Sequence, residues 1–364
     1  MVPRPVRDTA VRIINPMRTL SCLVIAVALV VGCSPAGSSP ATSPGGSSAP
    51  TSASVPSPAP SESAASPSGT LTIYSTVTQA TVEALVAAYE AAYPDVDVEV
   101  FRAPSGEVAA RIAAEQREGR VRADVLWLTD PLSMQAYDAD GLLGDYTPPD
   151  AAAIDPADRS DRYWATRLLN MVIVAGSEVT PAPADWSDLA DAAYADAIVL
   201  PDPAFAGSAF GVLGYLALDP AYGFDYYQRL RDNGAVQVQA PDEVTTGVAE
   251  GRFKAGATLD FSARAAAAKG SPVRLVWPSS GAITIYSPIA LVETSENRTA
   301  ATAFIDSVLS TAGQEAVAAS GWQPARADVK GGPAVEGTQI RPDWDAAYGR
   351  QSELLEEYQS IFGG

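Results

Sequence analysis

The sequence predicts an α/β body made of two lobes, and three observations support this fold class. Apolar runs typical of buried strands alternate with helical patterns along most of the chain after residue 70. These roughly 295 residues are long for one hydrophobic core, so two lobes are expected. A closed barrel would need eight regular strand and helix repeats, and the sequence does not contain them.

The first part of the body predicts three strand and helix repeats. The strands are expected at 71–74, 96–101 and 123–128. Apolar residues recur at helical spacing from Val82 to Tyr93, and Val108 and Ile112 mark a second helix. Asp130-Pro131 is typical of a helix start, and Gly141 ends that third helix. Because strands and helices alternate, a mostly parallel sheet is predicted.

The alternation continues after a middle segment rich in tryptophan and proline. Further strands are expected at 170–175, 197–202, 236–239, 255–261 and within 282–292. Further helices are expected at 208–218, 224–231, 243–250, 299–309, 312–319 and 350–361.

The chain begins with a pattern typical of an export signal, residues 1–33. Leu20–Val31 is almost wholly apolar and ends at Gly32-Cys33, in a stretch that reads LVVGCSP. A membrane-spanning helix is the alternative, but such a helix needs roughly 20 apolar residues, and this apolar run has only about a dozen. Met17 is a candidate start besides Met1. Residues 34–69 are nearly all Ser, Pro, Ala, Thr and Gly, which predicts a disordered tether.

Composition excludes several classes of function. Both cysteines, Cys22 and Cys33, lie in the signal, and the chain has no histidine, so no thiol chemistry and no imidazole site is expected in the body. No cofactor and no metal site are predicted. A net charge of −19 without a basic run argues against nucleic acid as a partner. Nucleophile-elbow and phosphate-loop motifs are missing, so an enzyme is not expected.

Four segments together resemble the extracellular solute-binding proteins of ABC importers, in the branch that contains ferric-ion, phosphonate and thiamine binders. They are LTIYSTVTQATVEALVAAYEAAYPDVDVEV, APSGEVAARIAAEQREGRVRADVLW, the Asp202-Pro203 turn with Gly207-Ser208, and SPIALVETSENRTAATAFIDSVLSTAGQEAVAASGWQPAR. The resemblance covers roughly residues 70–330. LVVGCSP resembles a lipobox, which implies that Cys33 is lipidated and anchors the protein on the extracytoplasmic face of the cell membrane.

The resemblance implies a two-lobed, type II periplasmic-binding-protein-like fold. Lobe one would comprise 70–168 and 286–364, and lobe two 169–285, with crossovers near 167–171 and 283–287. A small solute would lie in the cleft between them and be passed to permease subunits with a cytoplasmic ATPase, and a monomer is expected. A cell-surface interaction protein is the alternative of another class.

Polar residues that follow the strands are the candidate ligand contacts. Several would place hydroxyls and amides at helix N-termini, where an anionic group binds well, although the same residues also serve as ordinary caps. Trp127 could wall the cleft, and Arg264 could pair with an anion. The full set is Ser75, Thr76, Ser105, Gly106, Trp127, Thr129, Asp130, Gly207, Ser208, Ala209, Asp260, Ser262, Arg264, Tyr286 and Ser287.

The chain departs from the ferric branch at the iron ligands. Ferric binders of this kind carry a histidine after the first strand, a glutamate after the third and adjacent tyrosines later in the chain. Here those regions contain Thr78, Thr129-Asp130 and Asp260-Phe261-Ser262. We therefore expect a small anion or zwitterion, such as a phosphonate or phosphate ester, with Asp130, Asp202 and Asp260 near a cationic end. Ferric iron or an iron chelate remains the alternative.

Overall fold

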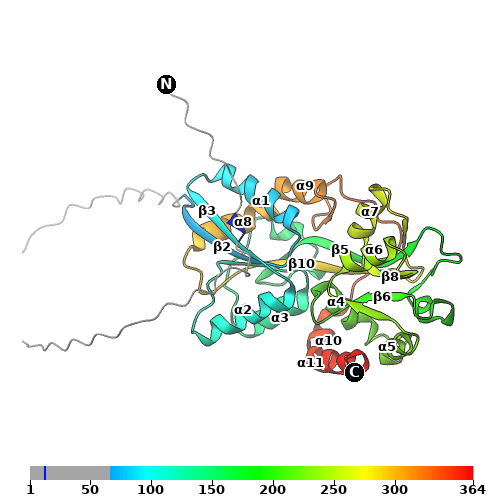
Figure 1. The fold of residues 1–364 in the computed structure, drawn as a ribbon. Coiled ribbons are helices and arrows are strands. Elements are labelled where there is room, and N and C mark those ends of the chain that lie inside the picture. Colours follow the sequence, from blue (N-terminus) through cyan, green and yellow to red (C-terminus); the bar gives the residue numbers. More distant parts are fainter. Residues whose placement is uncertain (1–11, 14–65, 364) are drawn as a thin grey trace, which may run out of the picture. The chain divides into compact units, whose positions relative to one another are not determined.

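The computed structural model describes residues 12–13 and 66–363. These residues form a twelve-stranded mixed sheet with helices on both faces (Figure 1). The short strand β1 (Arg12–Ile13), which falls within the predicted export signal, pairs in parallel with β3 (Val96–Arg102). Cys33 and all of the predicted tether up to residue 65 lie outside the described residues. Within the described part of the chain, no helix is long and apolar enough to cross a membrane.

One end of the sheet contains β2 (Gly69–Ser75), β3 and β4 (Val125–Trp127), which are parallel. Each strand is followed by a helix, as the alternating pattern predicts. These helices are α1 (Gln79–Ala92), α2 (Ser105–Arg117) and α3 (Pro131–Ala139). The predicted start of the third helix is confirmed, since the carboxylate of Asp130 accepts a hydrogen bond from the Ser133 amide at 2.7 Å.

The other end of the sheet contains β6 (Ile198–Pro201), β7 (Val236–Val238) and β8 (Ala255–Leu259), where β6 pairs in parallel with both neighbours. Its helices are α4 (Gly207–Leu216), α5 (Gly223–Asp232), α6 (Pro241–Ala249) and α7 (Asp260–Ala268). The two groups of strands therefore have the same construction, with their helices following the carboxyl ends of the strands.

Two long antiparallel strands join the groups, β5 (Tyr163–Gly176) and β10 (Ala282–Leu291). β10 pairs with β4 of the first group, and β5 pairs with β8 of the second. Both strands are almost completely buried, which explains why their sequences are mostly apolar and do not alternate between apolar and polar residues. Sequence periodicity predicts only the second half of β5, and it does not predict β9 (Val273–Val276), which pairs with β5.

The C-terminal part adds α8 (Arg298–Leu309), α9 (Thr311–Ala319), the short strands β11 (Gln323–Pro324) and β12 (Gln339–Ile340), α10 (Trp344–Tyr348) and α11 (Gln351–Phe362). The helix expected at 350–361 is present as α11. It lies against α4 and α5 rather than beside α1 or α2 (Figure 1). Tyr358 of α11 packs edge-on against Tyr227 of α5, at 5.1 Å between ring centroids.

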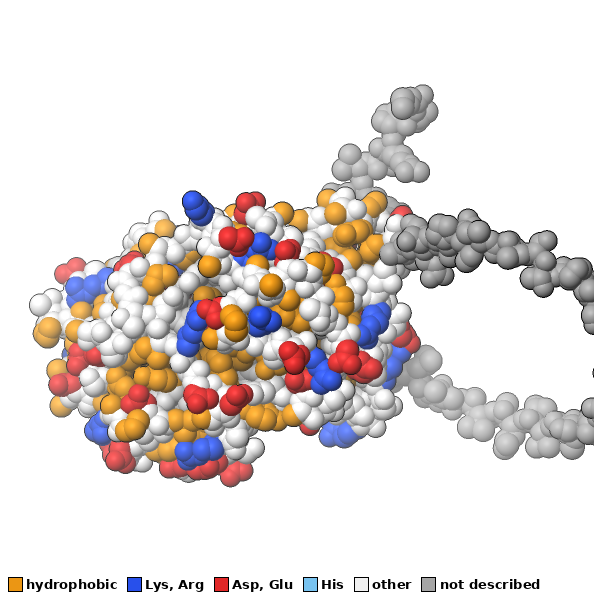
Figure 2. Space-filling view, turned by 180° about the vertical axis from the view of Figure 1, so that it is seen from behind, with side chains coloured by type: hydrophobic (Ala, Val, Ile, Leu, Met, Phe, Trp, Pro, Cys, Tyr) orange, Lys and Arg blue, Asp and Glu red, His pale blue; other side chains and the backbone are white. Residues whose placement is uncertain are grey.

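The core is apolar, and the largest completely buried side chains include four tryptophans and one arginine, Arg167. Most other charged residues lie on the surface, although Glu115, Asp124, Asp130, Asp158, Asp260 and Arg326 are also buried. On the face seen in Figure 2, acidic and basic side chains are interspersed with apolar ones and form no extended basic field.

Candidate functional site

A cavity of about 240 Å³ lies where the carboxyl ends of β2, β3 and β8 meet the first turns of α2, α4, α6 and α7. Elements from both groups of strands line it, together with Arg167 and Leu169 of β5. Ligands of open α/β sheets bind at this edge, because helix N-termini present amide groups there.

Arg167 gives the cavity its most unusual feature. Its side chain is completely buried, and its Nε atom has no hydrogen-bond partner among the described residues. Its only polar contact found there is a long one, 3.4 Å from Nη1 to the Thr78 hydroxyl, and no described carboxylate pairs with it. Burial and, to a smaller extent, the charge of Arg102 lower the pKa of this guanidinium to about 9.

Arg102, at the end of β3, is the second cation that lines the cavity. Its Nε atom donates to the carbonyl of Val77 at 2.6 Å, which fixes the guanidinium at the cavity wall. Burial lowers its pKa, and the negative charge of Asp242 opposes that shift. No described carboxylate lies within ion-pair distance of Arg102 either, so the cavity holds two cations without direct counterions.

Hydroxyl groups surround these cations. Thr76 and Thr129 share a hydrogen bond of 3.0 Å between their Oγ1 atoms, and Ser262 donates to Asp242. Ser208, in the first turn of α4, is buried at the wall. Hydroxyls and the next amides of the first turn of α4, after the Gly207 amide that donates to Ser105, are neutral donors that suit an oxyanion.

One wall of the cavity is aromatic. Phe261 and Trp322 stack with ring centroids 4.1 Å apart and planes 10° apart. Phe205, which is 42% exposed, lies on the loop before α4 and also lines the cavity. These side chains give the cavity an apolar side as well as a cationic one.

Two carboxylates lie at the N-terminus of α6 and line the same cavity. Asp242 accepts the Ser262 hydroxyl, and Glu243 accepts the Gln239 amide at 3.2 Å. The positive end of the α6 dipole stabilises acidic residues in this turn. The cavity thus combines guanidinium groups with acceptors for hydrogen-bond donors.

Six of the fifteen predicted contact residues line this cavity, and they come from both groups of strands. They are Thr76, Ser105, Thr129, Gly207, Ser208 and Ser262. The remaining predicted residues lie elsewhere, and most of them have structural contacts that account for their positions.

Arg264 is not at the cavity wall. Its Nη2 atom pairs with the buried carboxylate of Asp260 at 2.7 Å, one helical turn away. Asp260 also accepts from the Asn170 amide at 3.2 Å. These two residues compensate each other's charge. Nη1 of Arg264 is buried without a hydrogen-bond partner among the described residues, but Arg264 does not line the cavity.

The predicted residues around the central strands are inside the core. Trp127 is completely buried, and its indole donates to the Thr166 hydroxyl at 2.9 Å, so it packs the interior rather than walling the cleft. Ser75 donates to the carbonyl of Trp127 at 3.0 Å, and Ser287 donates to the carbonyl of Leu128. Tyr286 packs edge-on against Trp344.

Asp130, Gly106 and Ala209 lie next to the cavity without lining it. Asp130 is buried as the N-cap of α3, and burial raises its pKa. Gly106 is the second residue of α2. Ala209 lines a separate apolar cavity between α4, α5 and β6.

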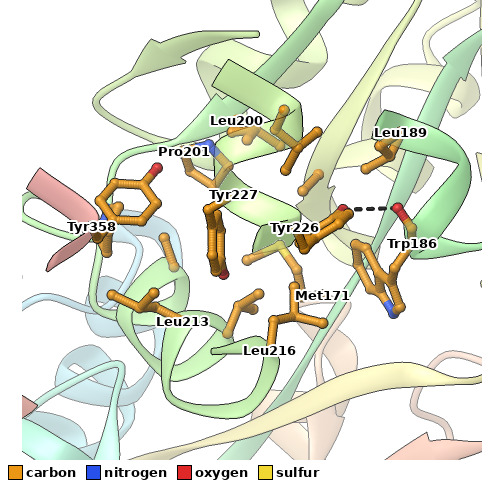
Figure 3. A pocket seen from close by; sticks show the side chains of 15 residues that line it. Met171, Trp186, Leu189, Leu200, Pro201, Leu213, Leu216, Tyr226, Tyr227 and Tyr358 are labelled. Atoms are coloured by element: carbon orange, nitrogen blue, oxygen red, sulfur yellow. Dashed lines mark hydrogen bonds between the residues drawn. The ribbon is translucent and has the colours of Figure 1, made fainter. Parts of the chain in front are cut away.

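That second cavity is small and enclosed by apolar side chains. It holds about 30 Å³, and Tyr226, whose hydroxyl donates to the Trp186 carbonyl at 2.8 Å, lies at its wall (Figure 3). Such a volume fits about one water molecule and offers it almost no polar partner. We therefore regard it as a packing space in the core.

Sequence reasoning missed both arginines of the cavity. Arg167 stands out in retrospect as a charge within the buried run YWATRLLNMVIVAG, and Arg102 directly follows a predicted strand. Isolated charges at such positions are rare because burying them is costly. Thr78, Gln239, Asp242, Glu243, Phe205, Phe261 and Trp322 were also not among the predicted contacts.

A family model described as "Bacterial extracellular solute-binding protein" matches residues 71–323 of this chain. The chain belongs to this family. Extracellular solute-binding proteins bind a small solute for an ABC importer and are not enzymes, as the sequence resemblance implies. A protein of Haemophilus influenzae without an assigned function is 25% identical over 262 residues, which is 68% of this chain and 75% of that protein.

Solved structures of periplasmic binding proteins share the fold of this solute-binding protein. The periplasmic binding protein P5PA is 24% identical, with a TM-score of 0.72, covering 81% of this chain and 99% of the other. AfuA from Actinobacillus pleuropneumoniae, with exogenous fructose 6-phosphate bound, is 21% identical, with a TM-score of 0.73 and the same coverage. Iron-bound HitA from Pseudomonas aeruginosa is 19% identical, with a TM-score of 0.70, covering 80% and 99%. These likenesses confirm the predicted type II fold.

Proposed function

We propose that this solute-binding protein is the receptor for a small solute that carries a phosphoryl group or a similar anionic group. The observation that carries the proposal is the buried guanidinium of Arg167, which has no described carboxylate partner and lies next to Arg102. A buried charge without a counterion is costly, and an anionic solute would supply the missing partner. Two guanidinium groups match the oxygens of a phosphoryl group.

Neutral donors extend the same anion site. The hydroxyls of Thr76, Thr129 and Ser208 and the first amides of α4 line the cavity beside the arginines. Charge-assisted hydrogen bonds are the strong ones, whereas neutral hydroxyls mainly fix the orientation of the group. AfuA, which shares this fold, was determined with a sugar phosphate bound, and this agrees with the proposal.

The other end of the solute should carry hydrogen-bond donors, either an amine or hydroxyls. The sequence suggested Asp130, Asp202 and Asp260 for a cationic end, but the carboxylates that line the cavity are Asp242 and Glu243. Both are exposed, so they can exchange water for a ligand donor at low cost. A zwitterion or a polyol phosphate fits this combination of charges.

Ferric iron is the less favoured solute. The described residues that line the cavity include no tyrosine, and the whole chain has no histidine. In the described part of the chain, no cluster of acidic residues is placed to hold a metal ion. Iron prefers phenolate and carboxylate oxygens as ligands, and two guanidinium groups at the site would repel the ferric cation electrostatically.

We also propose that the protein works as a hinged clamp with the lobes given above, 70–168 with 286–364 and 169–285. The two strand groups are connected through β5 and β10, which contain the predicted crossovers. Closure around the solute would exclude water and strengthen the arginine contacts. Lipidation of Cys33 would anchor the receptor beside permease subunits with their ATPase, and a monomer suffices for this function.

A thermal-shift screen of the full chain carrying Cys33→Ser tests the proposal. The set should include fructose 6-phosphate, aminoethylphosphonate, inorganic phosphate, sulfate, fructose and ferric citrate. A phosphorylated or phosphonate solute present at about 100 times its Kd should stabilise the protein by about 2.7 kcal/mol. Stabilisation by uncharged fructose or by ferric citrate alone would contradict the anionic solute. If a stable protein partner co-purifies and no small solute binds, the alternative function of a cell-surface interaction protein is favoured over that of a receptor.

A further inference from the structure

Gly207 and Asp130 form a contact between the two groups of strands, beside the cavity. Gly207 is the first residue of α4, which follows β6, and Asp130 caps α3, which follows β4. The Gly207 amide donates to the Ser105 hydroxyl at 3.2 Å, so the starts of α2 and α4 also touch. These contacts join parts of the chain that a hinge motion would separate.

The space at this contact admits only a glycine. A Cβ atom added to Gly207 would lie 3.0 Å from Cγ of Asp130, closer still to its Oδ2 atom, and 3.1 Å from the Ser105 hydroxyl. Asp130 cannot yield easily, because it is buried and both its carboxylate oxygens accept from Ser133. The backbone of α4 can therefore approach α3 this closely only when residue 207 has no side chain.

We infer that Gly207 and Asp130 are positioning residues that let the clamp close fully over its solute. This inference rests on the proposed hinged clamp. Full approach of α4 brings its first amides and Ser208 to the cavity that Arg102 and Arg167 line from the other elements. A methyl group at position 207 leaves both arginines in place but stops the motion before these donors reach the solute.

The substitution Gly207→Ala should weaken binding of fructose 6-phosphate by about ten- to a hundredfold, which is a loss of about 1.4–2.8 kcal/mol in the closed state. Gly349→Ala is the matched control, since a Cβ there meets no atom closer than 3.5 Å. The double variant Asp130→Ser with Gly207→Ala should recover most of the lost affinity. Serine keeps the N-cap function but is shorter than aspartate.

Closure itself can be measured by the distance between spin labels on the two groups of strands. The body has no cysteine, so Ala110→Cys in α2 and Ala267→Cys in α7, both at exposed positions, can be labelled in the full chain that also carries Cys22→Ser and Cys33→Ser. The parent should shift to shorter distances with fructose 6-phosphate, Gly207→Ala should not, and the double variant should shift again. A Gly207→Ala protein that closes and binds like its parent overturns the inference.

A failure of the proposed solute class is distinguishable from a failure of this inference. If no phosphate compound shifts the parent, the solute assignment is wrong. The distance distributions without solute then decide the inference, because the parent should include a short-distance component that Gly207→Ala lacks. Equal distributions for the two proteins overturn it.

Discussion

The guanidinium carbon of Arg167 lies 4.1 Å from the ring centroid of Trp322, and Trp322 in turn stacks on Phe261. Arg167 is thus held by a cation–π contact rather than by an ion pair with any described carboxylate. Stacking fixes the plane of the guanidinium and leaves its N–H groups without strong protein acceptors. The anionic solute that we propose would meet N–H groups that no described carboxylate occupies.

Arg167→Met should stabilise the protein without solute and abolish tight binding. The substitution removes a buried charge that has no described counterion, and even replacing a buried ion pair by well-packed apolar residues is often neutral or stabilising by about 1–4 kcal/mol. Loss of two or more charge-assisted hydrogen bonds should raise the Kd at least about a hundredfold. Thermal melts without solute and titration calorimetry with it measure both effects. A destabilised variant that still binds tightly would contradict the assigned role.

Arg264→Met should lower the stability of the protein and leave its solute affinity nearly unchanged, so it is the matched control for Arg167→Met. It leaves the buried carboxylate of Asp260 with Asn170 and its own helix but without a cation. We expect a loss of about 1–3 kcal/mol in the free energy of unfolding, because Arg264 is itself partly exposed. The affinity should change little. A large loss of affinity at unchanged stability would return the anion contact to Arg264, as the sequence first suggested.

Solute affinity should fall as the pH rises above about 9. The pKa of Arg167 is about 9 in the protein without solute, and a bound anion raises it. Above that pH, binding must take up a proton, so the Kd should increase by up to about tenfold per pH unit. Calorimetry in buffers of different ionisation enthalpy measures this proton uptake. In Arg167→Met the alkaline dependence should disappear, and its persistence there would assign it to another group.

Asp158→Asn should raise the melting temperature at neutral pH but not at about pH 4. Asp158 is buried, and burial raises its pKa from 3.8 to about 6, although Arg341 opposes the shift. Between these values the folded state binds more protons than the unfolded state, so this group's contribution to stability falls as the pH rises. Above about pH 6 the full destabilisation by the buried, ionised Asp158 carboxylate remains. A melting temperature that differs equally at both pH values would contradict the titration of Asp158.

Cys33→Ser should release the protein from the membrane or leave its precursor unprocessed. The expectation rests on the lipobox-like LVVGCSP segment and on the position of Cys33 directly before the Ser- and Pro-rich tether. A thioether-linked lipid is a strong membrane anchor, because each buried methylene contributes about 0.8 kcal/mol. Fractionation and mass spectrometry of the mature N-terminus test it. Cys22→Ser is the control and should remain anchored.

The sequence alone determined the α/β class and the order of most helices and strands. These features depend on local patterns, since helical spacing, apolar runs and caps such as Asp130-Pro131 are readable in a few neighbouring residues. Six of the fifteen proposed contacts reached the cavity for the same reason, because residues at the carboxyl ends of strands share one edge of a sheet.

Only the tertiary structure decided which charges are paired. Arg264 and Arg167 both follow apolar stretches. Arg264 forms an ion pair with Asp260, one helical turn away. Arg167 instead packs over the ring of Trp322, which lies 155 positions later in the chain. Likewise, Gly207 and Asp130 are 77 positions apart and become neighbours only when α4 packs beside α3. Whether a side chain is buried and whether its charge is paired both depend on contacts between segments that are far apart in the sequence. Packing of the whole fold fixes these contacts, and local sequence does not.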